Sequence, residues 1–359
     1  MKLLDRWLGD ILLTLHAWFH QRHAQRPVQI QRILLIKLVA MGDLILITPL
    51  VKTLRNAYPS AKVDLLTTPR VRPIVENTPL YNQIFYLSFG LDFLFSLLQN
   101  FRKLRCQQYD IVIDLEFYYR LTTLLSLAIR PAYFMGFDLQ KKRSQVMDLS
   151  VPYPEDLHVS DAFLEMAKAL GISTLVTTLE SLTVSSEDMA IAQKVRPSND
   201  YILIHFGTSS RAQSRRWDCQ KWTQLIQQLS ANWQIVLIGG HEETLLLPNI
   251  TLPQKNVTTL IGRLSIPQTA ALMKTAKLYI GLDTGPTHLA CAMGVPVLAL
   301  YGPNTPVRWG PKYAHVIYKQ WTCSPCTRQH EGIVSSCKDN QCMQQITVEE
   351  VVKQIHDLL

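Results

Sequence analysis

The chain has 359 residues, with 36 lysines and arginines against 28 aspartates and glutamates, which gives a formal net charge of +8. At roughly 150 residues per domain, this length predicts two domains and excludes a single small module. The residues are 47% hydrophobic and 18% charged, a globular balance that argues against extensive disorder. The positive surplus predicts an anionic partner, and composition alone leaves open whether that is a phosphorylated substrate, a membrane surface or a nucleic acid.

The first twenty residues follow an amphipathic pattern. On a helix they form one broad apolar stripe, comprising Leu4, Trp7, Leu8, Ile11, Leu12, Leu15, Trp18 and Phe19. Such a helix either lies in a membrane interface or packs on its own domain or on a second subunit. Asp5, Asp10 and His16 interrupt the apolar residues and no small-residue cleavage site follows. We therefore expect neither a signal peptide nor a membrane span, which needs about 18 apolar residues.

Beyond Pro27, apolar runs of strand length alternate with helical patterns. The expected strands are 33–36, 63–66, 84–87, 111–115, 133–137, 201–206, 234–238, 257–261, 278–282 and 297–301. The expected helices are 43–56, 91–104, 158–170, 218–229, 266–275 and 347–359, the last with Thr347 and Glu350 in capping-box spacing. This alternation predicts two doubly wound α/β domains with parallel sheets.

We expect three segments: a helical extension over 1–27, a first domain over 28–185 and a second over 186–359. Ligands of doubly wound sheets bind at the carboxyl ends of the strands. A ligand of the whole protein is expected in the cleft between the two domains.

The first candidate site is the turn Lys37-Leu-Val-Ala-Met-Gly42-Asp43. Gly42 allows a tight turn and close backbone approach. Asp43 falls at a strand's carboxyl end, where a carboxylate can act as general base toward a substrate hydroxyl. The turn by itself favours the plainer interpretation that Asp43 is a helix N-cap. The G-x-G-x-x-G glycines of a dinucleotide site are absent.

The second candidate is Asp283-Thr284-Gly285-Pro286-Thr287-His288, which follows an apolar strand and opens a helix. Helix N-termini bind phosphates through free N–H groups and the positive end of the helix dipole. Thr284 and Gly285 can offer a hydroxyl and an unobstructed amide to a diphosphate, and His288 lies one turn inside. A purely structural turn is the alternative.

Two further loops follow strands of the second half. The loop after His205 holds Thr208, Arg215 and Arg216, which suits an anion cradle or a solvated basic loop. Gly239-Gly240-His241-Glu242 ends another strand, and Glu242 either accepts hydrogen bonds from sugar hydroxyls or begins a helix. The four segments together fit sugar transfer from a nucleotide diphosphate better than hydride transfer.

On these residues the sequence resembles glycosyltransferase family 9, the heptosyltransferases of lipopolysaccharide core synthesis. The resemblance spans residues 32–359. It is carried by the GD-x(4)-TP block at Gly42, DLEFYYR, HFGTSSRAQSRRW, IGGHEE, DTGPTHLA and CMQQIT. It implies a GT-B architecture of two Rossmann-like domains with the active site between them. It also implies an inverting, metal-independent transfer without a cofactor, usually from ADP-heptose to a sugar of a lipid-linked acceptor.

The resemblance also implies roles for single residues. Asp43 matches the base that deprotonates the acceptor hydroxyl, and Gly42, Arg120 and Arg143 are expected on the acceptor side. The expected donor-binding residues are Thr208, Arg215, Arg216, Glu242, Asp283, Thr284, Gly285 and His288. Arg215 stands where the family commonly has a lysine, which keeps the charge but changes its geometry. Family members differ in the sugar they transfer, so the sugar and the acceptor stay open.

The late cysteines Cys323-x2-Cys326-x10-Cys337-x4-Cys342 have a spacing that can hold zinc. Unbridged thiols are the favoured interpretation, with zinc and disulfide pairing as alternatives, because persistent disulfides are disfavoured in the cytoplasm. We expect a cytoplasmic protein, either free or bound peripherally to the inner face of the cytoplasmic membrane through residues 1–20.

Three other functions are alternatives to glycosyl transfer. A nucleotide-sugar epimerase or hydrolase on the same fold is disfavoured by the DTGPTHLA block, and a non-catalytic glycan-binding relative by the presence of Asp43 beside that block. Nucleic-acid binding is not expected, because no Lys/Arg-rich tract or nucleic-acid motif occurs. We therefore expect the positive charge to serve substrate phosphates through Arg120, Arg215, Arg216 and the run Lys141-Lys142-Arg143.

Overall fold

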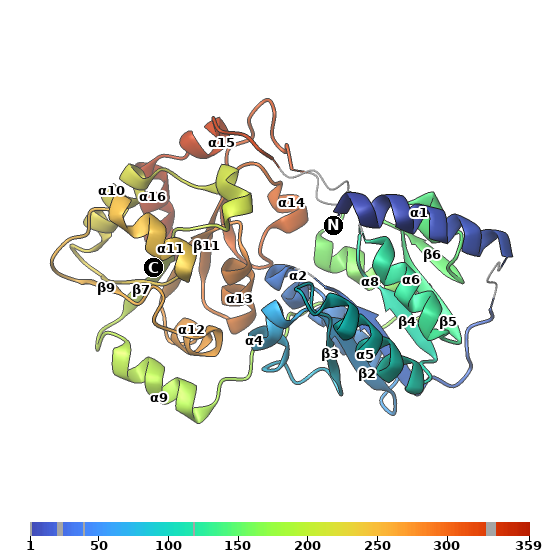
Figure 1. Ribbon diagram of the computed structural model, residues 1–359. Coiled ribbons are helices and arrows are strands. Elements are labelled where there is room, and N and C mark those ends of the chain that lie inside the picture. Colours follow the sequence, from blue (N-terminus) through green and yellow to red (C-terminus); the bar gives the residue numbers. More distant parts are fainter. Residues whose placement is uncertain (1, 20–23, 39, 118, 328–334) are drawn as a thin grey trace. The chain divides into compact units, whose positions relative to one another are not determined.

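The computed structural model describes residues 2–19, 24–38, 40–117, 119–327 and 335–359 (Figure 1). The chain divides into two compact units, one up to Thr178 and one from Leu179. The expected boundary after residue 185 lies a few residues further on. Each unit is built on one six-stranded parallel sheet, which confirms the prediction of two Rossmann-like α/β units.

The first sheet has the strand order β3-β2-β1-β4-β5-β6. From the central β1, the chain runs outward through β2 and β3, then returns to the other side of β1 and runs from β4 to β6. In such a sheet, ligands bind outside the carboxyl ends of the two strands at which the order reverses, here β1 and β4. The strands are β1 (Arg32–Ile36), β2 (Lys62–Thr67), β3 (Ile84–Tyr86), β4 (Ile111–Asp114), β5 (Tyr133–Asp138) and β6 (Leu149–Pro152).

The second sheet repeats this topology in the order β12-β11-β10-β7-β8-β9, so its order reverses between β7 and β10. Its strands are β7 (Tyr201–His205), β8 (Gln234–Leu237), β9 (Val257–Thr259), β10 (Leu278–Leu282), β11 (Val297–Tyr301) and β12 (His315–Tyr318). β7 and β10 are buried along their whole length, as expected for apolar runs covered on both faces.

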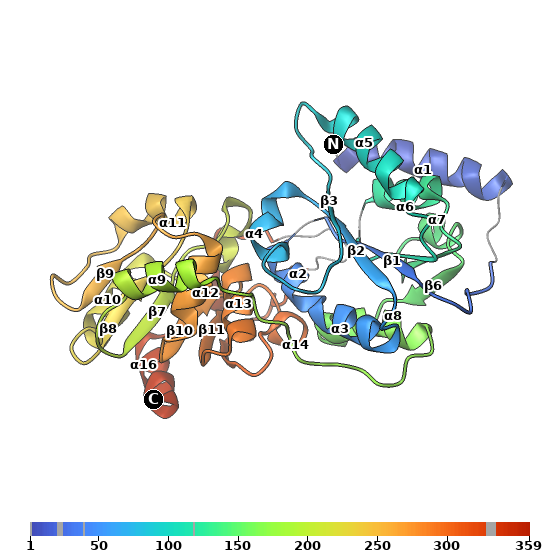
Figure 2. The ribbon, with the colours of Figure 1, turned by 90° about the horizontal axis from the view of Figure 1, so that it is seen from below.

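Helices cover both faces of the first sheet. In Figure 2, α1, α5 and α6 lie on one side of it and α3 and α8 on the other. The helices of this unit are α1 (Lys2–Phe19), α2 (Met41–Leu46), α3 (Thr48–Ala57), α4 (Arg72–Val75), α5 (Phe93–Cys106), α6 (Arg120–Ile129), α7 (Lys141–Ser144) and α8 (Val159–Ala169). A short 3₁₀ turn, η1 (Pro69–Val71), precedes α4.

The second sheet is covered in the same way. The helices α10 and α16 pack against each other, and α12 packs on α9 and α13. The α-helices of this unit are α9 (Ser186–Val195), α10 (Cys219–Leu229), α11 (His241–Leu246), α12 (Ile266–Met273), α13 (Gly285–Met293), α14 (Pro306–Trp309), α15 (Gln341–Gln344) and α16 (Val348–Leu358). Two 3₁₀ segments, η2 (Ser210–Arg215) and η3 (Leu247–Asn249), complete it.

Helix ends form where the sequence places capping residues. Asp218 caps α10 by accepting hydrogen bonds from the N–H groups of Gln220 and Lys221. Thr347 and Glu350 form the expected reciprocal capping box at the start of α16. These caps satisfy backbone donors that have no partner within the helix.

The prediction of a single helix over 43–56 is wrong, because the chain forms two helices, α2 and α3, with a break at Ile47. The Thr48 hydroxyl donates to the Ile45 carbonyl oxygen. Pro49 has no N–H to continue the first helix. The break lets α2 carry Asp43 at an angle independent of α3, which packs on α8.

Some residues of the expected amphipathic helix and of the DLEFYYR block lie outside the part of the chain that the structure describes. Met1, His20 and Tyr118 lie outside the described residues, as do the side chains of Leu4 and Phe19. No helix in the described part of the chain is both long and apolar enough to cross a membrane.

All seven cysteines are free thiols. Among the residues described, no group of histidine, cysteine and acidic side chains is arranged to hold a metal ion, and zinc at the late cysteines stays a prediction.

Candidate active site

The candidate site of the first unit lies where the strand order of its sheet reverses. Lys37 follows β1 and Glu116 follows shortly after β4, and the pairing of Ile36 with Asp114 brings these strand ends together. The Lys37 Nζ lies 2.8 Å from Asp43 Oδ2 and 3.3 Å from Glu116 Oε1. Lys37 and Glu116 are fully buried, whereas the Asp43 side chain keeps 10% of its surface exposed.

Lys37 is held in its charged form. Burial disfavours the ammonium, but attraction by Asp43 and Glu116 outweighs burial and raises the pKa of Lys37 above its ordinary value. The ring of Phe117 lies 4.8 Å from the ammonium nitrogen, which adds a cation–π contact. A permanent positive charge therefore orients the Asp43 carboxylate, whose exposed edge can accept a proton from a hydroxyl group.

The backbone around Asp43 is held from two neighbouring strands. The Leu38 N–H donates to Glu116 Oε1 at 2.6 Å, and the Thr68 hydroxyl donates to the Leu38 carbonyl oxygen at 2.9 Å. Sequence reasoning assigned no role to Lys37 or Glu116. The available signal was a charged residue at the end of a buried apolar strand, where burial of an unpaired charge is costly.

The turn geometry differs from the prediction for Gly42. The left-handed residue is Ala40, with φ of 76°, and it directly precedes α2. A non-glycine residue in a sparsely populated region costs about 1–3 kcal/mol. Gly42 lies inside the first turn of α2, so the expectation that it makes the tight turn is wrong. Its contact with an acceptor stays a prediction.

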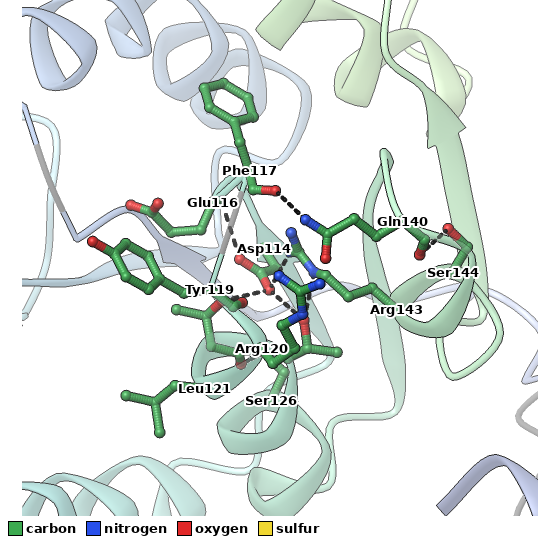
Figure 3. Close-up of polar contacts among 12 residues, drawn as sticks. Asp114, Glu116, Phe117, Tyr119, Arg120, Leu121, Ser126, Gln140, Arg143 and Ser144 are labelled. Atoms are coloured by element: carbon green, nitrogen blue, oxygen red, sulfur yellow. Dashed lines mark hydrogen bonds and ion pairs between the residues drawn. The ribbon is translucent and has the colours of Figure 1, made fainter. Parts of the chain in front are cut away.

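The two arginines expected on the acceptor side are both tied to carboxylates. Figure 3 shows the contact between Arg143 and Asp114. Arg120 begins α6, and its Nε donates to Asp10 Oδ1 at 2.9 Å. Arg143 is fully buried in α7 and donates to Asp114 Oδ2 at 2.9 Å and to Thr123 Oγ1 at 2.8 Å. Burial raises the pKa of Asp114 even though Arg143 opposes this.

This geometry corrects the expectation for the basic run 141–143. Lys141 and Lys142 are exposed, but Arg143 points inward and is inaccessible to a ligand on the surface. Lys141 lines a shallow surface pocket of about 450 Å³ together with Asp138, Gln140 and Ser144. Within the run, only the two lysines therefore present positive charge at the surface.

The candidate site of the second unit lies where β7 and β10 meet. The Arg215 NH1 donates to the Asp283 carbonyl oxygen at 3.0 Å and lies 3.3 Å from its carboxylate. The amide of Asn304, after β11, also donates to the Asp283 carboxylate. Asp283 is buried and thus joins the ends of two strands to the loop that carries Arg215.

Arg216 connects two of the predicted loops. Its Nε donates to the Thr208 hydroxyl at 3.1 Å and its NH2 to the Thr208 carbonyl oxygen at 3.3 Å. The same NH2 lies 4.0 Å from Glu242 Oε2 at the start of α11. The side chains of Arg216 and Glu242 remain partly exposed, so both can contact a ligand.

The N-terminus of α13 supplies the remaining predicted donor residues. Thr284 is the N-cap, its side chain makes no capping hydrogen bond, and Gly285 and Pro286 form the first turn. His288 is buried one turn inside the helix. The helix has nine residues, and its first turn directs N–H groups and the positive dipole end toward the carboxyl end of β10.

Sequence patterns did not identify a buried pair, His205 and Glu243, at the carboxyl end of β7. His205 Nε2 lies 3.4 Å from Glu243 Oε1, and Glu243 Oε2 accepts a hydrogen bond from the Gly240 N–H at 2.7 Å. Burial lowers the pKa of His205, although Glu243 acts in the opposite direction. A Cβ at Gly207 would lie 2.1 Å from Glu243 Oε1, so the buried glutamate requires glycine there.

The structure thus brings most predicted donor residues together. Arg216 contacts Thr208 and Glu242, and Arg215 contacts Asp283. The helix α13 starts at the strand end that Asp283 follows. Of the predicted acceptor residues, Asp43 stands with Lys37 and Glu116, whereas Arg120 and Arg143 belong to separate ion pairs. The ligand-binding roles of these residues stay predictions.

Comparisons with known proteins show the family and the fold of the chain. The family model described as glycosyltransferase family 9 (heptosyltransferase) matches residues 97–334. The chain is similar to lipopolysaccharide heptosyltransferase 3 of Escherichia coli (strain K12), with 27% identity over 296 residues that cover 77% of this chain and 84% of the relative.

Two solved structures show the same fold. The family 9 glycosyl transferase from Veillonella parvula DSM 2008 matches with a TM-score of 0.80 and 20% identity, covering 92% of this chain and 98% of that one. E. coli heptosyltransferase WaaC with ADP matches with a TM-score of 0.69 and 21% identity, covering 92% and 100%. Because the family model covers more than half of the sequence, the chain belongs to glycosyltransferase family 9 and is a glycosyltransferase of the GT-B fold.

Proposed function

We propose that this protein transfers a heptose from ADP-heptose to a sugar of a lipopolysaccharide core or a related lipid-linked glycan. The names of its relatives support the sugar and the pathway, since the E. coli relative is a lipopolysaccharide heptosyltransferase and the WaaC structure contains ADP. The observation that carries the proposal is the exposed edge of Asp43, which a buried ammonium orients at the carboxyl end of β1.

The proposed reaction is an inverting displacement. Asp43 takes the proton of the acceptor hydroxyl while the acceptor oxygen forms a bond to the anomeric carbon of the donor. The bond from that carbon to the diphosphate breaks on the opposite face, and the electron pair leaves with ADP. The products are the glycosylated acceptor, ADP and a proton carried by Asp43. The anomeric configuration is inverted because the acceptor oxygen attacks the face opposite the leaving diphosphate.

In this proposal cationic side chains and a helix N-terminus stabilise the leaving diphosphate without a metal. Arg215 contacts Asp283 through one terminal nitrogen, and a guanidinium carries five N–H donors in a rigid fork. The same side chain can therefore bind Asp283 and a phosphate together. Arg216 and the first turn of α13 add further donors. One such preorganised contact contributes about 3 kcal/mol to lowering the barrier.

The acceptor side and the membrane belong to the same proposal. A lipid-linked acceptor requires that the enzyme work close to a bilayer, and residues 1–20 carry the amphipathic helix α1. We assign the peripheral contact to that helix, on the cytoplasmic side where nucleotide sugars are found.

The test is a panel of nucleotide sugars incubated with the enzyme and a truncated lipopolysaccharide acceptor. The expected result is release of ADP from ADP-heptose only when the acceptor is present. The product should show an inverted anomeric configuration by NMR, and EDTA should leave the rate unchanged. Release of nucleotide without an acceptor would indicate a hydrolase, and conversion of the donor sugar without transfer would indicate an epimerase.

A further inference from the structure

The helix α1 packs on its own unit through its polar edge. The Asp5 carboxylate accepts hydrogen bonds from the N–H groups of Arg120 and Leu121 at 3.1 and 2.9 Å, which caps the start of α6. Asp10 accepts from Arg120 Nε. A Cβ at Gly9 would lie 2.3 Å from the Cβ of Arg120, so the glycine permits this close packing. Both acidic residues of α1 therefore face the protein.

The apolar stripe of α1 consequently faces outward. Its exposed members are Trp7, Leu8, Ile11, Leu12, Leu15 and Trp18, and Trp18 keeps 83% of its surface accessible. Leu13 and Ala17 are the apolar residues of the helix that join the core. The helix α1 thus packs on its own unit while its tryptophans remain on the surface, so its apolar face is open to a membrane or a second subunit.

The helix α5 packs Leu97, Phe101 and Leu104 against the core and also carries exposed apolar side chains. Its buried side includes Ser96 and Asn100, and the Asn100 amide donates to the Tyr86 carbonyl oxygen at 2.8 Å. Leu94, Phe95 and Leu98 are exposed on its other side. Leu91, just before the helix, is also exposed. α5 therefore packs apolar side chains on the core and also leaves leucines and an aromatic ring exposed, as α1 does.

The two exposed faces belong to one layer. Both helices pack against α6, and Figure 2 shows all three on the same side of the first sheet. We name their outward apolar residues the α1/α5 surface, which comprises Trp7, Leu8, Ile11, Leu12, Leu15, Trp18, Leu91, Leu94, Phe95 and Leu98. Large exposed apolar side chains gathered on one layer of a unit indicate an interaction surface.

The charge of α5 points to the chemistry of the partner. The helix contains three basic residues, Arg102, Lys103 and Arg105, and no acidic residue. All three are exposed, and Arg102 and Arg105 continue the helical stripe of Phe95 and Leu98. The one acidic residue beside it, Asp92, accepts a hydrogen bond from the Ser88 hydroxyl. An apolar stripe that continues into basic residues complements anionic headgroups above an acyl layer.

We propose that the α1/α5 surface docks this enzyme on an anionic lipid bilayer, with α5 as a second contact helix beside α1. The inference deepens the proposed membrane contact of residues 1–20 and rests on the proposed function only for its biological purpose. A two-fold dimer through this surface would bring the basic residues of both copies into one interface, whereas an anionic bilayer neutralises them. The two tryptophans of α1 suit the boundary between headgroups and acyl chains.

The test measures binding of the full-length protein to vesicles by co-sedimentation. The test variant combines Leu94→Gln, Phe95→Ser and Leu98→Gln, which leaves α1 intact and changes only exposed side chains. The matched control combines Leu245→Gln, Val307→Gln and Tyr313→Ser, three exposed apolar positions of the other unit. A charge variant combines Arg102→Gln with Lys103→Gln. Circular dichroism and thermal unfolding verify that each variant folds.

We expect the wild type and the control to bind vesicles that contain phosphatidylglycerol, and the α5 variant to bind about tenfold more weakly. The charge variant should lose affinity only for anionic vesicles, because its effect is electrostatic. Brominated lipids should quench tryptophan fluorescence in the wild type more than in the α5 variant.

The proposal is overturned if the α5 variant binds vesicles as tightly as the wild type, or if the wild type binds none. It is also overturned if the variant instead converts a wild-type dimer to a monomer in sedimentation velocity. Transfer to a lipid-free acceptor sugar separates this result from the proposed function. The α5 variant should retain that activity, whereas an enzyme that docks but transfers no sugar would contradict the function and leave the docking surface intact.

Discussion

Lys37 Nζ lies 2.8 Å from Asp43 Oδ2 at the carboxyl end of β1, and Lys37 is fully buried while Asp43 reaches the surface. The ammonium orients the carboxylate and leaves 10% of the Asp43 side chain exposed. Glu116 binds the same ammonium from the neighbouring strand end, so one buried cation organises two acidic groups.

Replacing Asp43 should remove the proton acceptor and leave donor binding intact. We expect Asp43→Asn and Asp43→Ala to lower kcat by about 10²–10⁴-fold, the range for loss of a general base. Nucleotide binding should persist, because the donor residues contact one another without Asp43. Steady-state kinetics and calorimetric titration with ADP measure the two effects. Full turnover by either variant would exclude Asp43 as the base.

Removal of Lys37 should destabilise the fold. Lys37→Met leaves the buried Glu116 and the nearly buried Asp43 without their shared cation, which costs about 3–5 kcal/mol of unfolding free energy. The double variant Lys37→Met with Glu116→Gln should recover part of this loss. Urea unfolding of both variants measures the coupling. Strictly additive losses would show that the two residues do not interact.

Arg143 offers a direct test of a structural against an acceptor-binding role. Arg143→Met should lower the unfolding free energy by about 3–5 kcal/mol, because Asp114 would be a buried carboxylate without its cation. The exposed control Lys141→Ala should change stability by less than about 0.5 kcal/mol. If Arg143→Met is as stable as the wild type and instead raises the acceptor KM, the inward ion pair is not its main role.

Arg215 should matter for the leaving diphosphate. We expect Arg215→Ala to lower kcat by about 10²-fold, equivalent to about 3 kcal/mol. Arg215→Lys should retain part of the activity, since it keeps the charge but loses the bidentate fork. The measurements are kcat and the donor KM with a constant acceptor. Equal loss in the lysine and alanine variants would show that fork geometry, rather than charge, carries the effect.

His205 should contribute to acid sensitivity. Its pKa is lowered in the folded protein because the ring is buried, so the unfolded chain binds a proton at a higher pH than the folded chain does. Stability is therefore unaffected well above the ordinary histidine value of about 6.5 and falls by about 1 kcal/mol per pH unit below it. His205→Gln should flatten this decline between pH 7.5 and pH 5 in thermal unfolding. An unchanged pH dependence would contradict the lowered pKa.

Much of the fold and part of the site were predictable, because apolar runs and strand-end residues are local patterns. The strands around Ile33, Tyr201 and Leu278, the caps at Asp218 and Thr347, and the strand-to-helix turns at Asp43 and Asp283 follow from short sequence spacing. A parallel sheet directs all its strand carboxyl ends to one edge. The turns that belong to the same sheet could therefore be placed on one edge without coordinates. The break at Ile47 was missed because apolar periodicity continues across it, although Pro49 is a local signal for it. The positive φ of Ala40 was missed because alanine rarely adopts it.

By itself the sequence determined the alternation of strands and helices, the residue types at the strand ends, and hence the family. Only the tertiary structure decided which charges meet. Lys37 and Glu116 are far apart in the chain and touch because β1 pairs with β4. It also decided which side chains face inward: Arg143 rather than Lys141, Glu243 rather than Glu242, and the acids rather than the tryptophans of α1. Periodicity defines the faces of a helix, but which face is covered depends on the neighbours that pack against it.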